Sequence, residues 1–161
     1  MENNGEISGG YLEHPMAEDA MIMMQRALAS SEQDFGDFFL ARLMGFDISY
    51  GEDSCTVQFD AGPTLGNPQG SLHGGVIATA MDVSMGHLLR RHHGPGITLE
   101  MKVQYLAAVK SGPVAATARF IRAGKSIAFL QSVLVDAEGT ELAVASATWK
   151  RLKVPMSTND K

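Results

Sequence analysis

The sequence lacks most of what disulfide-linked, membrane-spanning and nucleic-acid-binding proteins require. It holds one cysteine, Cys55, so no disulfide can form within the chain, and the strand-like flanks of this residue indicate a small buried hydrophobe. No apolar run approaches the roughly 18 residues that a membrane-spanning helix needs. Acidic residues outnumber basic ones by 18 to 13, and the net charge of −5 argues against a nucleic-acid partner.

Residues 1–15 also lack the basic start and the apolar run of a secretory signal. We therefore expect a cytoplasmic protein without a membrane partner. The 161 residues do include 45% hydrophobic ones, which is enough for one domain with a buried core. We expect a tail and a helix over residues 1–34, the folded domain over residues 35–154, and a polar tail over residues 155–161.

Hydrophobic periodicity predicts one helix before this domain and one inside it. The first carries an apolar seam that we expect to pack in a core or on another subunit: Met21, Met24, Ala27 and Leu28. The second runs from about Gly75 to Arg91 and ends at the segment HHGPG. The face that we expect to pack on a sheet comprises Ile77, Ala80, Met81, Ser84 and Leu88.

The remaining segments alternate between apolar and polar residues, as strands do. Residues 44–50 and 55–59 form two such segments around the turn Gly-Glu-Asp. Four more follow the second helix, and tight turns between them predict an antiparallel meander. In the first of these four, the apolar set is Ile97, Leu99, Met101, Val103 and Tyr105. We predict an α+β fold in which a curved antiparallel sheet wraps around the central helix, with a further helix at the N-terminus.

Asp82 lies two turns inside the central helix with no cation beside it. The residues three and four positions away are Ala78, Thr79, Met85 and Gly86. Burying an unpaired carboxylate either costs several kcal/mol or raises its pKa. Two interpretations stay open: a functional carboxylate in an apolar site, or one that accepts hydrogen bonds from a loop or from a neighbouring subunit.

The helix is preceded by the step His73-Gly74-Gly75. The first N–H groups of a helix lack intrahelical partners and carry partial positive charge, so they can stabilise a developing oxyanion. Glycine at positions 74 and 75 leaves room for a substrate to approach them. A polarising helix start followed by a carboxylate suits the hydrolysis of an activated carbonyl.

The segment NPQGSLHGGVIATAMD, residues 67–82, resembles the active-site segment of hotdog-fold acyl-CoA thioesterases of the phenylacetic-acid-degradation type. In both, Asn, Gly and His-Gly-Gly precede an apolar helix that carries Asp. The segment GITLEMKVQYLAAVKSGPV resembles the next strand of that family, and the resemblance covers about residues 35–153. It implies a hotdog fold and hydrolysis of an acyl-CoA thioester without a metal or other cofactor, because coenzyme A is part of the substrate.

The resemblance also implies roles for five residues. Asp82 corresponds to the catalytic carboxylate, which acts as a general base on water or as a nucleophile, and the Gly74 N–H corresponds to the donor to the thioester carbonyl. Asn67 and His73 correspond to positioning residues, and Thr98 to one that orients the attacking water. From the residues alone, His73 can instead brace the loop, and Asn67 can simply make the Asn-Pro turn.

In this family the site is shared across a homodimer, and dimers often pair into homotetramers, so we expect one of these two states. The basic hairpin region at Arg122, Gly124 and Lys125 resembles the part of the family that contacts the coenzyme A phosphates. A solvated turn is the alternative interpretation of this hairpin.

Two other functions stay open. A hotdog hydratase or dehydratase also acts on acyl thioesters, but it pairs a histidine with a carboxylate at other spacings. A non-catalytic acyl-CoA-binding protein would more readily lose a carboxylate such as Asp82. His87, His92 and His93 do not share the spacing of one helix face, so we expect no metal site. The sequence leaves the acyl group undetermined.

Overall fold

The computed structural model describes residues 16–153, which divide into two compact units. One unit ends at Gly45 and the other begins at Phe46. The tail expected over residues 155–161 lies outside the described residues, as do residues 1–15.

The first unit consists of two helices, α1 (Ala17–Leu28) and α2 (Phe39–Met44). The guanidinium of Arg42 joins them, because it donates to the backbone oxygens of Ala27 and Ser30 at 3.1 and 2.8 Å. Met44, which the sequence places in a strand, instead ends α2, and Gly45 at φ 68° provides the left-handed residue that closes a helix.

The apolar seam of α1 is largely exposed among residues 16–153. Ala27 is fully buried, whereas Met21, Met24 and Leu28 are between 46% and 68% exposed. The six residues of α2 cover little of α1, so the described residues provide core packing for one of the four seam residues. Packing of the seam on another subunit stays a prediction.

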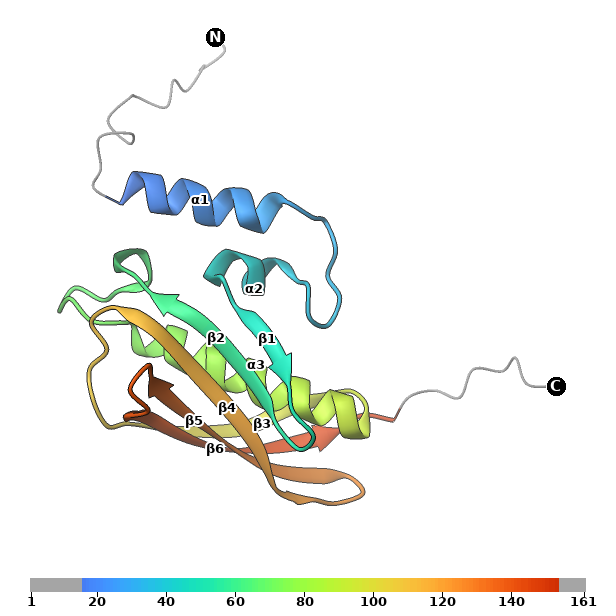
Figure 1. Ribbon diagram of the computed structural model, residues 1–161. Helices are drawn as coiled ribbons and strands as arrows, with labels where there is room; N and C mark the ends of the chain where they lie inside the picture. Colours follow the sequence, from blue (N-terminus) through green and yellow to red (C-terminus); the bar gives the residue numbers. More distant parts are fainter. Residues whose placement is uncertain (1–15, 154–161) are drawn as a thin grey trace, which may run out of the picture. The chain divides into compact units, whose positions relative to one another are not determined.

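The second unit is a six-stranded antiparallel sheet with one long helix against it (Figure 1). Its strands are β1 (Asp47–Tyr50), β2 (Cys55–Ala61), β3 (Gly96–Tyr105), β4 (Gly112–Ala123), β5 (Ile127–Asp136) and β6 (Glu141–Arg151). Their order in the sheet is β1-β2-β4-β5-β6-β3. Cys55 is fully buried in β2, as the sequence predicts.

The helix α3 (Gly74–His93) lies at the centre of this unit, and strands β2 to β6 all contact it. The face predicted to pack on the sheet is buried, each of its five residues being at most 3% exposed. A sheet that contacts one helix with five of its strands must curve around it. The predicted α+β architecture, a curved antiparallel sheet around a central helix with a further helix before it, is therefore confirmed.

The predicted four-strand meander is correct for β4, β5 and β6 and wrong for β3. β3 pairs with β6 and forms one edge of the sheet, so it is not a neighbour of β4. The connection over residues 106–111 passes the start of α3, where the Leu72 N–H donates to the Val109 oxygen at 2.7 Å. Turn-forming residues in this connection mark a break between strands but do not reveal where the next strand pairs.

A β-bulge in β3 also changes which of its residues face the helix. The register shifts between Thr98 and Glu100, with Thr98 opposite Trp149 and Met101 opposite Ala147 of β6. Paired residues lie on the same face of a sheet, so Thr98 and Met101 share one face although three positions separate them. The predicted strict alternation from Ile97 to Tyr105 is therefore wrong, and the bulge turns Thr98 toward α3.

Candidate active site

The start of α3 leaves one backbone donor free. His73 is the N-cap residue: its Nδ1 accepts from the Gly75 N–H at 2.9 Å, and its backbone oxygen accepts from the N–H groups of Val76 and Ile77. Among residues 16–153 the Gly74 N–H has no hydrogen-bond acceptor. Because a helix start carries partial positive charge, this N–H is suited to an electron-rich oxygen.

Gly74 also lines a pocket with a volume of about 330 Å³. The other lining residues are Asn67, Ser71, Leu72, Ile77, Tyr105, Leu106, Ala107, Ala108 and Val109. They come from the loop before α3, from the first turns of α3, and from the end of β3 with the connection after it. None of them is charged, so the free N–H of Gly74 is the feature of this wall that attracts an anionic oxygen.

Tyr105 is a pocket residue to which sequence reasoning assigned no role. Its hydroxyl donates to the Gly74 oxygen at 2.9 Å. A Cβ atom at position 74 would lie 3.2 Å from Tyr105 Cζ, a tight contact, so glycine eases the approach of the ring to the helix start. In the sequence, Gly74 indicates that something approaches the helix start closely. That Tyr105 is the residue which does so becomes evident only when β3 is placed beside α3.

Asn67 and His73 both organise the loop, as their simpler interpretations proposed. Asn67 Oδ1 accepts from the N–H groups of Gln69 and Ser71 at 3.0 and 3.2 Å, and Asn67 Nδ2 donates to Ser71 Oγ at 3.0 Å. His73 Nδ1 is occupied by the cap, so a neutral His73 ring carries its proton on Nε2. The structure thus places Asn67 on the pocket wall and leaves His73 Nε2 as a donor on an exposed ring.

Asp82 has a partner that the helix could not provide. Thr98 Oγ1 on the edge strand β3 donates to Asp82 Oδ1 at 2.8 Å. Burial raises the pKa of the Asp82 carboxyl above its ordinary value, and the hydrogen bond from Thr98 opposes that shift because it stabilises the charged form. Sequence reasoning named both residues, and the structure brings them together.

Asp82 and Gly74 are not brought together within one chain. Asp82 lies eight positions after Gly74 in the same helix, which corresponds to a rise of about 12 Å. A reacting carbon must lie within about 3 Å of both an attacking group and an oxyanion donor. One thioester therefore cannot contact the Asp82 carboxylate and the Gly74 N–H of the same chain.

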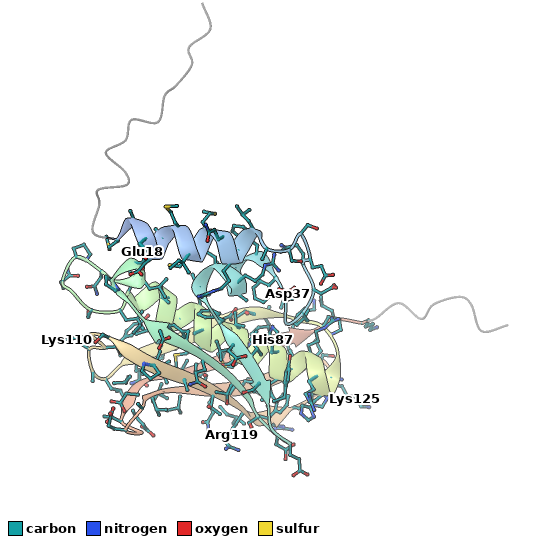
Figure 2. The ribbon with its side chains drawn as sticks, turned by 45° about the horizontal axis from the view of Figure 1, so that its top comes forward. Glu18, Asp37, His87, Lys110, Arg119 and Lys125 are labelled. Atoms are coloured by element: carbon teal, nitrogen blue, oxygen red, sulfur yellow. The ribbon has the colours of Figure 1, made fainter. Side chains whose placement is uncertain are left out.

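Arg122, Gly124 and Lys125 lie at the β4–β5 hairpin. Figure 2 shows Lys125 at the opposite end of this unit from Lys110, the residue that comes directly after Val109 of the pocket wall. The Gly124 oxygen accepts from Arg151 Nη1, which holds the hairpin against the end of β6. Arg122 and Lys125 are exposed, and within residues 16–153 neither forms a salt bridge. Both cations are therefore accessible from solvent.

The three histidines weighed as metal ligands make other contacts. His87 is buried in α3, and its Nδ1 lies 2.8 Å from the Tyr50 hydroxyl, while His92 and His93 pack edge-on against Phe120. Burial, and then Arg90, lower the pKa of His87. In the described part of the chain, no group of three or more His, Cys, Asp or Glu side chains could hold a metal ion.

Comparison with known proteins relates the chain to thioesterases. Residues 69–143 match the family described as Thioesterase superfamily. The chain is 30% identical over 127 residues to the medium/long-chain acyl-CoA thioesterase YigI of Escherichia coli (strain K12), covering 67% of this chain and 82% of that protein. It is 35% identical over 66 residues to acyl-coenzyme A thioesterase 13 of Homo sapiens, covering 39% of this chain and 47% of that one.

Two solved structures share the fold. The BH2602 protein from Bacillus halodurans, determined with CoA, has a TM-score of 0.78 at 23% identity and covers 88% of this chain and 97% of its own. The conserved protein PA5202 from Pseudomonas aeruginosa has a TM-score of 0.69 at 28% identity, and the match covers 73% of this chain and 97% of that protein.

Several of the curated relatives are matched over less than two thirds of their own length. No helix within residues 16–153 is long and apolar enough to cross a membrane.

Proposed function

The chain belongs to the thioesterase superfamily, and from that premise we propose that it hydrolyses an acyl-CoA thioester to the free acid and coenzyme A. The observation that carries this proposal is the Gly74 N–H, which has no acceptor among residues 16–153 and lies in the wall of an uncharged pocket. The names of its relatives support acyl-CoA as the substrate class. Membership of the phenylacetic-acid-degradation type and a cytoplasmic location stay predictions.

The Gly74 N–H donates to the thioester carbonyl oxygen and stabilises the negative charge that develops there. A helix start suits this role because its dipole is already oriented and needs no rearrangement during the reaction. His73 Nε2–H is a second donor next to it, for the same carbonyl or for a water molecule. Asn67 keeps the loop in the conformation that exposes these donors, through its bonds to Gln69 and Ser71.

Asp82 supplies the attacking group. As a general base, its carboxylate takes a proton from water while the water oxygen bonds to the thioester carbon, and the thiolate of coenzyme A leaves with the electron pair of the C–S bond. As a nucleophile, the carboxylate itself bonds to that carbon, and water later cleaves the resulting anhydride. Thr98 orients the carboxylate or the water through its hydroxyl. Neither route needs a metal or a further cofactor.

We propose that each site combines Gly74 of one chain with Asp82 of a second copy, in a homodimer or a homotetramer. The rise of about 12 Å between the two residues supports this division. Thr98, the partner of Asp82, belongs to β3, which is an edge strand and therefore has unpaired backbone groups. A second copy docked along β3 about a twofold axis would bring each Asp82 toward the helix start of the other chain.

The basic hairpin is our proposed contact for the coenzyme A phosphates. Arg122 and Lys125 are exposed cations without salt-bridge partners in the described chain, and Gly124 lies between them in the turn. Charge-assisted hydrogen bonds from such side chains suit a nucleotide that stays at the surface.

A pair of substitutions at position 74 tests the proposed donor. Gly74 is the first residue of α3, where proline is tolerated, and His73 at φ −66° and ψ 131° has the extended backbone that precedes proline. Gly74→Pro therefore deletes the N–H, whereas Gly74→Ala keeps it and adds the same Cβ beside Tyr105. We expect kcat to be lower by about 10²–10³-fold in the proline variant than in the alanine variant. Equal rates in the two would contradict the role of this N–H.

The activity itself is tested by the release of free thiol from a panel of acyl-CoA substrates, with wild type against Asp82→Ala. We expect the wild type to release coenzyme A and the variant to be slower by about 10²–10⁴-fold. Equal release by both would contradict the role of Asp82. Tight binding of acyl-CoA without any turnover by the wild type would instead indicate a non-catalytic acyl-CoA-binding protein.

A further inference from the structure

We propose that Tyr105 is a positioning residue for the start of α3. Together with His73 it holds the peptide unit between Gly74 and Gly75 from both ends, and this restraint fixes the two proposed donors of the site. The inference rests on the proposed hydrolysis of acyl-CoA for its functional meaning. It assigns a role to a residue that the sequence pattern places only in the apolar set of a strand.

The peptide unit between Gly74 and Gly75 is hydrogen-bonded to a side chain at each end. Its oxygen, on Gly74, accepts from the Tyr105 hydroxyl at 2.9 Å. Its N–H, on Gly75, donates to His73 Nδ1 at 2.9 Å. A peptide unit is planar and trans, so its C=O and N–H point in opposite directions. The two side chains therefore restrain one plane from opposite sides.

A step of two glycines is where such a restraint has most effect. Glycine has more backbone freedom than any other residue, so a helix that begins with two of them begins loosely. Each glycine also faces one of the two restraining side chains. A Cβ atom at position 74 would lie 3.2 Å from Tyr105 Cζ, and one at position 75 would lie 3.0 Å from His73 Nδ1. The residues that loosen the helix start thus also ease the approach of the side chains that hold it.

Tyr105 can serve as a fixed point because the backbone around it is anchored. It is the last residue of β3, where it is paired with β6. The N–H groups of the next two residues, Leu106 and Ala107, both donate to the Leu142 oxygen, at 2.9 and 3.2 Å. All of these bonds, and the two that hold the peptide unit, lie within one chain. The restraint therefore does not depend on a second copy.

The restraint reaches both proposed donors. The torsion angles of Gly74 connect the held plane to the peptide unit that carries the Gly74 N–H, so holding the plane limits the directions of this N–H. Hydrogen bonds in series also polarise one another. The bond from Tyr105 to the Gly74 oxygen makes the N–H at the other end of the unit a stronger donor to His73 Nδ1. This nitrogen thereby stays an acceptor, and the proton of the neutral ring stays on Nε2.

Tyr105→Phe tests the restraint, because it removes the hydroxyl and keeps the ring. We expect kcat for a well-hydrolysed acyl-CoA to fall about 3- to 10-fold, the effect of one hydrogen bond of ordinary net strength. KM should change less than about twofold, because the charge that the donors stabilise develops only in the transition state.

Tyr50→Phe is the matched control. It removes a tyrosine hydroxyl that lies 2.8 Å from His87 Nδ1, in the second half of α3, and its kcat should stay that of wild type. An unchanged kcat in Tyr105→Phe would overturn the proposal. An equal fall in both variants would overturn it as well, since the loss would then reflect a general loosening of the helix.

Hydrogen exchange of the Gly75 amide, followed by NMR, tests the restraint without reference to activity. This N–H should exchange about 3- to 10-fold faster in Tyr105→Phe than in wild type, and at the wild-type rate in Tyr50→Phe. Unchanged exchange in Tyr105→Phe would overturn the inference even if the protein is an active thioesterase. If wild type hydrolyses no acyl-CoA but exchange is faster in Tyr105→Phe, the proposed function fails and the restraint stands.

A double-mutant cycle tests whether the two side chains act on one unit. In His73→Ala the N–H end of the peptide unit is free, so a restraint at the oxygen alone fixes little. In that background Tyr105→Phe should change kcat by less than about twofold, against 3- to 10-fold in the wild-type background. A full effect of Tyr105→Phe in His73→Ala would show that the two residues act independently, and would overturn the joint restraint.

Discussion

Asp82 and Thr98 form a pair whose hydrogen bond opposes the effect of burial on the proposed catalytic carboxylate. Burial raises the pKa of Asp82, and the Thr98 hydroxyl lowers it by donating to the charged form. The proposed base or nucleophile must be deprotonated, so activity is lost as the pH falls through this raised pKa.

Replacing Thr98 by valine should therefore move the acid limb of the kcat/KM profile to higher pH, because the valine variant keeps the burial and loses the opposing hydrogen bond. Thr98→Ser retains the hydroxyl and serves as the control, with a limb close to that of wild type. The measurement is the pH dependence of kcat/KM for one well-hydrolysed acyl-CoA. A limb that moves to lower pH in Thr98→Val, or stays in place, would show that this bond does not tune the carboxyl.

Cys55 is a second residue whose surroundings determine its chemistry. It is fully buried in β2, and burial raises the pKa of its thiol to about 12. Since the thiolate is the reactive form, we expect Cys55 not to react with a disulfide reagent at pH 8 in the folded protein and to react fully in denaturant. Quantitative labelling of the native protein would contradict this burial. The same inertness allows coenzyme A release to be followed with a thiol reagent.

At the scale of elements, α3 approaches the sheet closely because a glycine faces a tryptophan. A Cβ atom at position 86 would lie 2.8 Å from Cη2 of Trp149, a rigid and buried ring on β6. Gly86, four residues after Asp82, thus has a packing reason in addition to any role in the site. Gly86 is part of the core contact between α3 and β6.

Gly86→Ala should therefore destabilise the protein, although the same change in an exposed helix stabilises it by about 1 kcal/mol. Overpacking against Trp149 costs about 1–3 kcal/mol, which we expect to exceed that gain. The Trp149→Phe variant lacks the indole ring that position 86 contacts, so Gly86→Ala should be neutral or stabilising in that background. This variant also lacks the indole N–H, which has no acceptor among the described residues. Urea denaturation of the four proteins in this cycle measures the difference, and equal effects in both backgrounds would argue against the contact.

Elements also differ in how far the sequence determines them. The long helix and its buried face follow from local periodicity, which is why the face from Ile77 to Leu88 is predicted correctly. The position of β3 beside β6 and the bulge at Thr98 depend on pairing between distant segments, and no local pattern records either. For the same reason the sequence locates Asp82 and Thr98 but not their hydrogen bond, and it identifies Gly74 without Tyr105.

At the scale of the whole molecule, the rise of about 12 Å between Gly74 and Asp82 predicts that activity requires two chains. Two inactive variants with defects on opposite sides of the site test this directly. In a mixed dimer of Asp82→Ala with Gly74→Pro, one site contains both defects, and the other contains the intact Asp82 of the proline variant and the intact Gly74 of the alanine variant.

Mixing equal amounts of the two variants under conditions of subunit exchange should therefore restore up to about a quarter of the wild-type activity, since half of the dimers are mixed and half of their sites are intact. Each variant alone, treated under the same exchange conditions, is the control and should stay inactive. If Gly74 and Asp82 of one chain served the same site, every site would contain a defect and mixing would restore nothing. Sedimentation of the wild-type protein as a monomer at assay concentration would contradict the shared site independently, because no second chain would then be present to complete it.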